Sequence, residues 1–165
     1  MQRLTPFLTA RQISGPAVAQ AARLEEPVDV VLSPAAQMTR LVNIDRAAHG
    51  LRAVSYDQAL TAVARWRSED MAVRQYFSHD IGAVPGLLVF DILRSQGISY
   101  RRAGENLADT YVAADAAAAD AEAALMRSPT HRANILGADF THLGVGAAVA
   151  SSGRVVFTQL FKSAW

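Results

Sequence analysis

The 165-residue chain contains no cysteine, which excludes disulfide bonds, thiolate catalysis and zinc sites built on cysteine. Charged residues make up 19% of the sequence, and 16 basic against 15 acidic residues leave a net charge of +1. Because no cluster of Lys and Arg provides a positive surface, we expect no nucleic-acid partner. No apolar run approaches the roughly 20 residues of a membrane-spanning helix, so we expect no transmembrane segment.

Hydrophobic residues, by contrast, make up 51% of the chain, enough for one globular domain with a sizeable core. Residues 1–32 show no clear periodicity and contain Pro6, Pro16 and Pro27, so we interpret them as an N-terminal extension or linker. We recognise no signal peptide, since Arg11 and Gln12 interrupt the only candidate apolar stretch. The globular domain is expected to cover residues 33–165.

The pattern of apolar residues predicts four helices and about three strands. Ser33-Pro34 is typical of a helix start and predicts a helix up to His49-Gly50. Apolar stripes at helical spacing predict further helices over 57–75, 86–96 and 115–127. The apolar runs 142–150 and 154–162 predict a β-hairpin, and 100–107 predicts a third strand. Helices mixed with antiparallel strands indicate an α+β domain.

Three polar residues from separate segments are candidates for a site: His79, Glu105 and His131. Each has an ordinary interpretation when taken alone. His79 follows the second predicted helix and can cap its C-terminus, where the helix dipole favours a cation. Glu105 stands beside a glycine and can be a solvated carboxylate in a turn. His131 can be a loop residue in the first turn of a short helix that runs to 136.

Taken together, two imidazoles and a carboxylate that converge on one point can bind a divalent cation or transfer a proton through water. Histidine nitrogens suit zinc, copper or nickel, whereas calcium prefers more carboxylate oxygens. The same residues can form a base and its orienting partner for hydrolysis. Asn106 and Ser128 are further candidates for lining the cleft, although Ser128 also fits the end of the fourth helix. Neither H-E-x-x-H nor G-x-S-x-G occurs, so the common zinc-protease and serine-hydrolase mechanisms gain no support.

A series of short motifs extends over about residues 37–162 in a fixed order. The motifs are Asn43-x-x-Arg46, Gly50-Leu51, Asp57-x-x-Leu60, Asp70-Met71-Ala72, Tyr76-Phe77-Ser78-His79, Gly104-Glu105-Asn106-Leu107-Ala108, Ser128-Pro129-x-His131-Arg132-x-Asn134-Ile135-Leu136, Gly144-Val145-Gly146 and Thr158-Gln159. In this order they resemble a bacterial CAP domain, also called the SCP domain. The superfamily comprises cysteine-rich secretory proteins, antigen 5 and plant pathogenesis-related 1 proteins.

The resemblance implies an α-β-α sandwich, with about four helices around a small antiparallel sheet and a cleft on one side. It also implies a cleft tetrad of two histidines and two acidic residues. His79, Glu105 and His131 match three members and are the predicted metal ligands, with zinc favoured. The second acidic residue falls at Ser128, which supplies no charge. The resemblance further implies a secreted or cell-envelope location.

Because the chain can form no disulfide bonds, packing alone must stabilise the fold. We assign Trp66 to the hydrophobic core. The remaining expected core residues are Phe77, Leu125, Ile135, Phe140, Val145, Phe157 and Leu160.

Three functions are compatible with these residues. The first is a non-catalytic extracellular binding module whose His/Glu-lined cleft binds a divalent metal and/or a small ligand, such as a lipid, glycan or peptide. The alternative is a metal- or His/Glu-dependent, peptidase-like hydrolase in which Glu105, His79 and His131 are catalytic. The third is a structural network in which these side chains only tie loops to the core.

Overall fold

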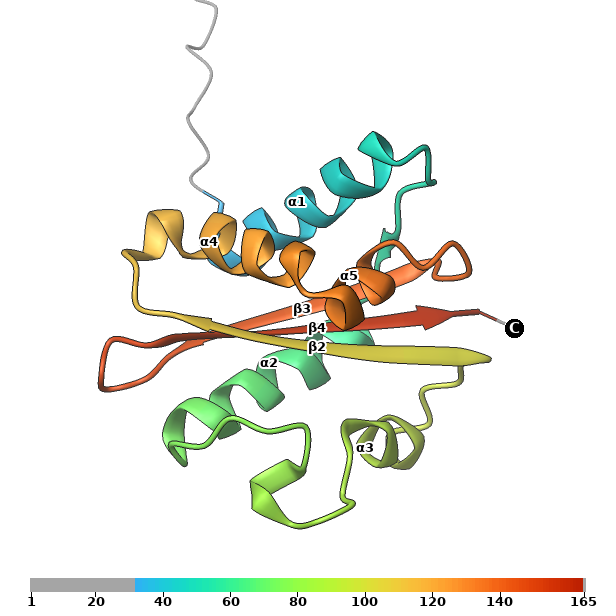
Figure 1. Cartoon of the computed structure of the whole chain (residues 1–165). Helices are drawn as coiled ribbons and strands as arrows, with labels where there is room; N and C mark the ends of the chain where they lie inside the picture. The colour runs from blue at the N-terminus through green and yellow to red at the C-terminus, as the bar shows by residue number, and fades with distance from the viewer. Residues whose placement is uncertain (1–31, 165) are drawn as a thin grey trace, which may run out of the picture. The chain divides into compact units, whose positions relative to one another are not determined.

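The computed structural model describes residues 32–164, so the expected extension at 1–32 lies, apart from Leu32, outside the described residues. The chain order is α1 (Pro34–Ala48), β1 (Ser55–Tyr56), α2 (Gln58–Val73), a 3-10 turn (Ile81–Ala83), α3 (Val89–Ser95), β2 (Arg102–Thr110), α4 (Ala114–Arg127), α5 (Pro129–Ile135), β3 (His142–Val149) and β4 (Val155–Ser163). Helices α1, α4 and α5 cover one face of the sheet, and α2 and α3 cover the other (Figure 1). The predicted α-β-α sandwich is therefore confirmed.

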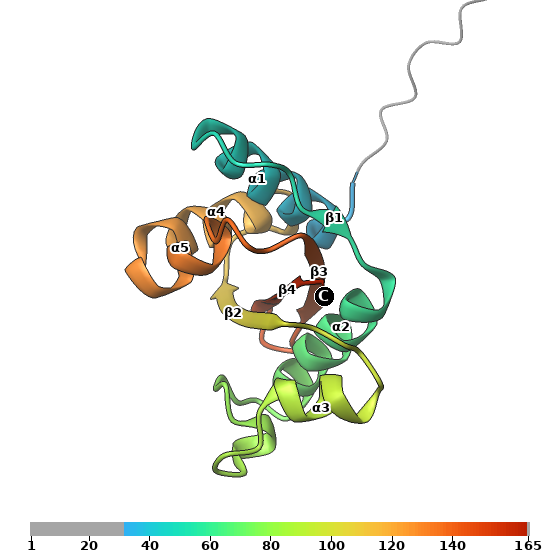
Figure 2. The ribbon, with the colours of Figure 1, turned by 90° about the vertical axis from the view of Figure 1, so that its right-hand side faces the viewer.

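The sheet has the strand order β1-β3-β4-β2. The predicted hairpin is β3 and β4, and β2 pairs with β4 along its whole length, both antiparallel. The two-residue strand β1, which the sequence did not indicate, pairs in parallel with the first two residues of β3. Seen from the side, β2 and β3 lie on opposite sides of β4 (Figure 2).

Side-chain caps explain where the first two helices begin. The Ser33 hydroxyl accepts a hydrogen bond from the Ala36 amide, and Asp57 Oδ1 accepts one from the Leu60 amide at 2.9 Å. Each cap satisfies a backbone N–H that has no partner inside its helix. Both predicted starts are thereby confirmed. His49 occupies the C-cap of α1, as its position beside Gly50 indicated.

Two glycines set the close approach between α2 and β3. A Cβ atom at Gly144 would lie 2.4 Å from the Leu60 carbonyl carbon, and one at Gly146 would lie 2.2 Å from that of Ala64. Real Cβ atoms do not come this near to a backbone, so the Gly-x-Gly motif is needed for the helix to lie flat on the sheet. This face of β3 consequently belongs to α2.

Most of the expected core is confirmed: Leu125, Ile135, Phe140, Val145, Phe157 and Leu160 are all buried. Phe77 and Trp66 were wrongly placed there, since they are 43% and 40% exposed. Phe77 lies in the loop beyond the end of α2 rather than on the helix. Trp66 belongs to α2 but lies beside its buried stripe and lines a groove with α3 residues such as Ile92.

Candidate functional site

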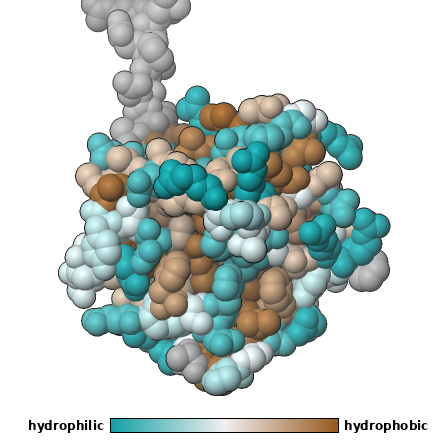
Figure 3. Space-filling model, in the orientation of Figure 1, coloured by the Kyte–Doolittle hydropathy of each residue, from teal (hydrophilic) through white to brown (hydrophobic). Residues whose placement is uncertain are grey.

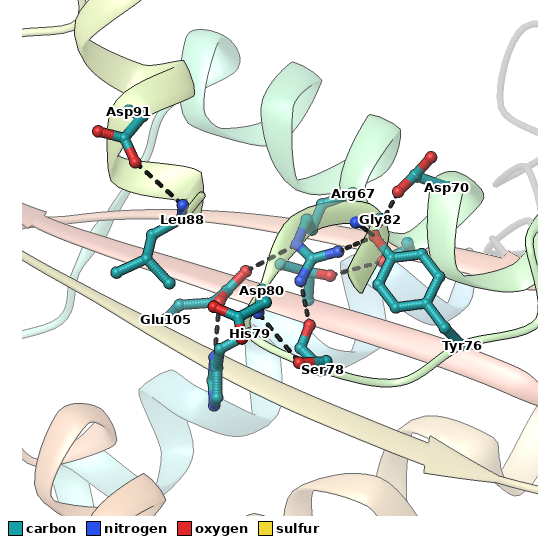
Figure 4. A network of polar contacts seen from close by, with 12 residues as sticks. Arg67, Asp70, Tyr76, Ser78, His79, Asp80, Gly82, Leu88, Asp91 and Glu105 are labelled. Carbon is teal, nitrogen blue, oxygen red and sulfur yellow. Dashed lines mark hydrogen bonds and ion pairs between the residues drawn. The ribbon is translucent and has the colours of Figure 1, made fainter. Parts of the chain in front are cut away.

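Glu105 is the centre of the candidate site. It lies on β2, its side chain is 3% exposed, and both carboxylate oxygens have partners. Oε1 accepts a hydrogen bond from Arg67 Nε at 3.3 Å, and Oε2 lies 2.7 Å from His79 Nδ1 (Figure 4). The interpretation of Glu105 as a solvated turn carboxylate was therefore wrong, because a strand buries it against α2.

Arg67 is the residue of this site that the sequence analysis missed. It is fully buried on α2, donates to the Tyr76 hydroxyl at 2.6 Å, and also donates to the Ser78 carbonyl. Its guanidinium carbon lies 5.5 Å from the centre of the Tyr76 ring, within the range of a cation–π contact. The signal was available in the sequence: Arg67 interrupts the apolar stripe of α2 at a buried position, and a charge there requires a partner.

These contacts shape the loop that carries His79. Helix α2 ends at Val73, with Arg74 in the C-cap position, so the prediction that His79 caps this helix was wrong. The Tyr76 hydroxyl, whose pKa is raised by burial, donates to Asp70 and accepts a hydrogen bond from the Gly82 amide at 2.8 Å. The loop is thus held on both sides of His79 by partly buried polar contacts, at the Ser78 carbonyl and the Gly82 amide.

His79 is oriented by the carboxylate but remains accessible. Its side chain is 52% exposed, and the hydrogen bond to Glu105 raises its pKa. Since Nδ1 faces Glu105, Nε2 is directed away from the carboxylate (Figure 4). A carboxylate on one ring nitrogen fixes the tautomer and ring direction, as it does in many metal-binding histidines.

His131 lies in α5, which confirms the short helix expected there. It is partly buried. Its pKa is lowered mainly by this burial and, to a smaller extent, by the charge of His79. Asn106, fully buried, donates to the His131 carbonyl at 3.0 Å and accepts from Asn134 Nδ2 at 2.8 Å. Asn106 therefore supports the helix that carries His131 from beneath instead of facing solvent.

Asn106 belongs to a buried polar chain that extends to α4. Its amide nitrogen also donates to Gln159 Oε1 at 2.9 Å, and Gln159 Nε2 donates to Glu122 Oε2 at 2.6 Å. Glu122 is 3% exposed, and burial raises its pKa to about 8. The backbone of His131 is thus linked through side chains to a buried carboxyl group on α4.

Ser128 occupies the junction of α4 and α5, as C-cap of the former and N-cap of the latter, which confirms its expected place at the end of the fourth helix. Its hydroxyl lies 3.3 Å from Thr130 Oγ1. The other two histidines have different partners: His49 Nε2 is 3.0 Å from Arg132 Nη2, and His142 Nδ1 is 2.8 Å from Thr141 Oγ1.

The donor set fits a divalent cation only in part. Within residues 32–164, no group of three or more His, Cys, Asp and Glu is arranged to hold a metal ion. Both Glu105 oxygens are engaged, one by a cationic guanidinium, and that arrangement does not favour direct ligation by this carboxylate. The two imidazoles are the remaining nitrogen donors: Glu105 fixes the ring of His79 and raises its pKa, whereas burial lowers the pKa of His131.

The sequence matches the profile of the cysteine-rich secretory protein family, abbreviated CAP, over residues 39–161. The chain belongs to this family. It is 36% identical over 125 residues to the uncharacterized protein YkwD of Bacillus subtilis, which covers 76% of this chain and 45% of YkwD. It is 37% identical over 129 residues to the uncharacterized membrane protein YlbC of the same species, covering 78% of this chain and 34% of YlbC.

Among solved structures, an extracellular protein containing an SCP domain from Bacillus anthracis has a TM-score of 0.68 and 31% identity. The match covers 79% of this chain and 40% of that protein. The CAP chain described here thus spans less than half the length of these relatives. Within its described residues, no helix combines the length and apolar character needed to cross a membrane.

Proposed function

We propose that this CAP domain is a non-catalytic extracellular binding module, whose cleft at His79, Glu105 and His131 binds a divalent metal ion and/or a small ligand. The observation that carries the proposal is the contact between Glu105 Oε2 and His79 Nδ1, which orients an accessible imidazole. The extracellular assignment rests on the family and on the relative from Bacillus anthracis, which is described as extracellular.

In this proposal His79 and His131 hold the metal, and Glu105 orients His79 rather than ligating the ion itself. Zinc is favoured because imidazole nitrogens are among its preferred ligands. When bound, zinc would supply an electrophilic centre for an oxygen atom of a ligand. Hydrophilic and hydrophobic residues are interspersed on the face where β2 is the front strand (Figure 3). This suits a small molecule, lipid, glycan or peptide with a polar group.

The contacts of Glu105 and Ser128 support binding rather than catalysis. A general base must be free to accept a proton, but Glu105 already accepts from Arg67 and contacts His79. A serine nucleophile must contact its base, but the Ser128 hydroxyl contacts Thr130.

The hydrolase alternative is favoured by one observation at His131. Burial lowers its pKa, so its ring is neutral near pH 7 and can accept a proton. Turnover of a broad substrate panel that is abolished by His131→Ala, with far-UV circular dichroism unchanged, would support this alternative. Absence of turnover across the panel would leave the binding module as the better account.

The test of the proposal is a calorimetric zinc titration of the metal-free chain at pH 7.5, together with two double variants. We expect one-to-one binding that the His79→Ala/His131→Ala variant loses while it stays folded. The matched control is His49→Ala/His142→Ala, which removes the two histidines that are not proposed ligands and should leave zinc affinity unchanged. Equal loss in both variants, or no binding by the native chain, would refute the metal part of the proposal.

A further inference from the structure

Arg46 in α1 belongs to a sequence motif, Asn43-x-x-Arg46, that the candidate site does not use. The residue is 1% exposed, and its hydrogen bonds within residues 32–164 all go to backbone carbonyls. Burial of a guanidinium without a carboxylate partner is costly and lowers its pKa. A charge kept in such a place indicates that its hydrogen bonds serve a purpose.

The acceptors of Arg46 lie in two segments of the chain. Its Nε donates to the Arg52 carbonyl at 2.9 Å, in the loop that follows α1. Its Nη1 donates to the carbonyls of Ile135 at 2.7 Å and Gly137 at 2.9 Å, and Nη2 donates to that of Phe140 at 3.3 Å. Three of the four carbonyls thus belong to the end of α5 and the turn that leads to β3.

Helix α5 depends on contacts from outside itself. It has seven residues, Pro129–Ile135, and a helix this short is not stable alone in water. Ile135 is its last residue, so its carbonyl has no partner inside the helix. Arg46 supplies that partner and also places a positive charge at the helix C-terminus, where the dipole favours a cation.

The same helix carries His131, about one turn before the carbonyl that Arg46 binds. Asn106 of β2 binds the backbone of His131 itself, at the carbonyl. The helix is therefore held at two points, by β2 near His131 and by α1 at its C-terminal end. Helices α1 and α5 lie in the same layer on one face of the sheet (Figure 2).

We propose that Arg46 is a positioning residue for His131: it holds α5 by its C-terminal carbonyl groups and thereby sets the place of the His131 imidazole in the cleft. This inference rests on the proposed function, in which His131 and His79 hold the metal. Arg67 supports His79 in a similar way, because it donates to the adjacent Ser78 carbonyl. Each histidine is then held by a buried arginine, one from α1 and one from α2, on opposite faces of the sheet.

The geometry requires arginine rather than any cation at position 46. A guanidinium presents five N–H groups in a planar fork, whereas a lysine ammonium presents three from a single, strongly hydrated atom. Arg46→Lys therefore keeps the charge but cannot reach all four carbonyls. The control is Asn43→Ala in the same motif. Asn43 also makes two hydrogen bonds to backbone, but both go to Val54 and neither reaches α5.

The first measurement is made on the metal-free chain, with sucrose present to favour the folded state. In Arg46→Lys, nuclear magnetic resonance should show displaced ring signals for His131 and unchanged ring signals for His79. Hydrogen exchange should be faster at the Leu136 amide, which closes the last turn of α5 on the Arg132 carbonyl. Asn43→Ala should leave the His131 ring and the Leu136 amide as they are in the native chain.

The second measurement is zinc affinity by calorimetry in the same solution. Arg46→Lys should raise the zinc Kd at least about tenfold, the usual scale for losing a group that orients a metal ligand. Arg46→Gln, which also removes the charge, should raise it at least as much, and Asn43→Ala should keep the native Kd. An unchanged Kd in Arg46→Lys, or equal losses in Arg46→Lys and Asn43→Ala, would overturn the proposal.

The native chain provides a test that needs no variant. If the hold of Arg46 on α5 strengthens zinc binding, zinc must in return strengthen that hold. Zinc should therefore slow hydrogen exchange at the Leu136 amide more than at the Val54 amide, which is bound by Asn43. Equal slowing at both amides would contradict the inference. Failure of the native chain to bind zinc would refute the proposed metal site instead, and the metal-free His131 signals would still decide whether Arg46 positions this ring.

Discussion

Arg67 and Glu105 form an ion pair that is almost completely removed from water: Nε lies 3.3 Å from Oε1, and the side chains are 0% and 3% exposed. The same carboxylate orients His79 through its other oxygen. One contact between α2 and β2 therefore contributes to both the packing of the domain and the geometry of the candidate site.

Arg67→Met is expected to lower the free energy of unfolding by about 3–5 kcal/mol, because it leaves Glu105 buried without its cationic partner. Urea denaturation followed by circular dichroism measures this change. The double variant Arg67→Met/Glu105→Gln should recover part of the loss, since the uncompensated charge is then gone. The control Arg65→Met removes an exposed ion pair with Glu69 on the same helix and should cost at most about 1 kcal/mol. Similar losses at both positions would contradict the buried-pair account.

Glu105→Gln is expected to lower the pKa of His79 toward its ordinary value of 6.5, because the hydrogen bond that raises it becomes neutral. A nuclear magnetic resonance titration of the four histidine rings checks this, with His142 as internal reference. In the native chain the folded-state pKa of His79 lies above its unfolded value. Its contribution to stability is thus complete below about pH 6.5 and is lost as the pH rises through the folded pKa. An unchanged His79 titration in Glu105→Gln would show that the carboxylate does not control this ring.

Gly146→Ala is expected to destabilise the domain by about 1–3 kcal/mol or more, because the added Cβ would overlap the backbone of Ala64 and push α2 from the sheet. Thermal unfolding measures the loss as a lowered Tm. A variant with native Tm would mean that α2 can shift without cost, and that Gly-x-Gly is not what sets the distance between helix and strand.

Local patterns were enough to predict the layers of the fold. Ser33 and Asp57 are residue types that commonly cap helix N-termini, so they indicated where α1 and α2 begin. The β3–β4 hairpin was predicted from two apolar runs separated by a turn. The strand β1 escaped prediction because two exposed residues have no periodicity, and only the neighbouring β3 makes them a strand.

The sequence predicted which residues belong to the candidate site, but not the contacts that hold them in place. The motifs identified His79, Glu105 and His131, and local sequence could not show that Glu105 is held by Arg67, a residue 38 positions away. The position of Asn106 shows the same limit. On a strand, adjacent side chains point to opposite faces, so Glu105 faces α2 while Asn106 supports α5. Which neighbour belongs to the cleft depends on the sheet, not on the motif.

The last prediction concerns Glu122, at the other end of the polar chain beneath His131. Burial raises its pKa to about 8 from an ordinary 4.5, and the carboxyl of Asp45 on the facing helix α1 adds to this shift. Among the described residues, Glu122 Oε1 has no hydrogen-bond partner, and the hydrogen bond from Gln159 to Oε2 offsets only part of the effect of burial on the pKa. At Glu122 the folded chain therefore binds more protons than the unfolded chain between about pH 4.5 and 8, and the contribution of this group to stability should fall as the pH rises through this window.

Glu122→Gln should remove this slope, which has an upper limit of roughly 1.4 kcal/mol per pH unit, and should make the variant more stable than the native chain above pH 8. Urea denaturation at a series of pH values from 5 to 9 checks both effects. The control Glu69→Gln alters a side chain that is 52% exposed and should keep the native pH dependence. A native-like slope in Glu122→Gln would show that another group causes the loss of stability.

Since Gln159 joins Glu122 to Asn106, ionisation of this buried acid should also loosen the helix that carries His131. Zinc affinity should therefore fall above pH 8 in the native chain but not in Glu122→Gln.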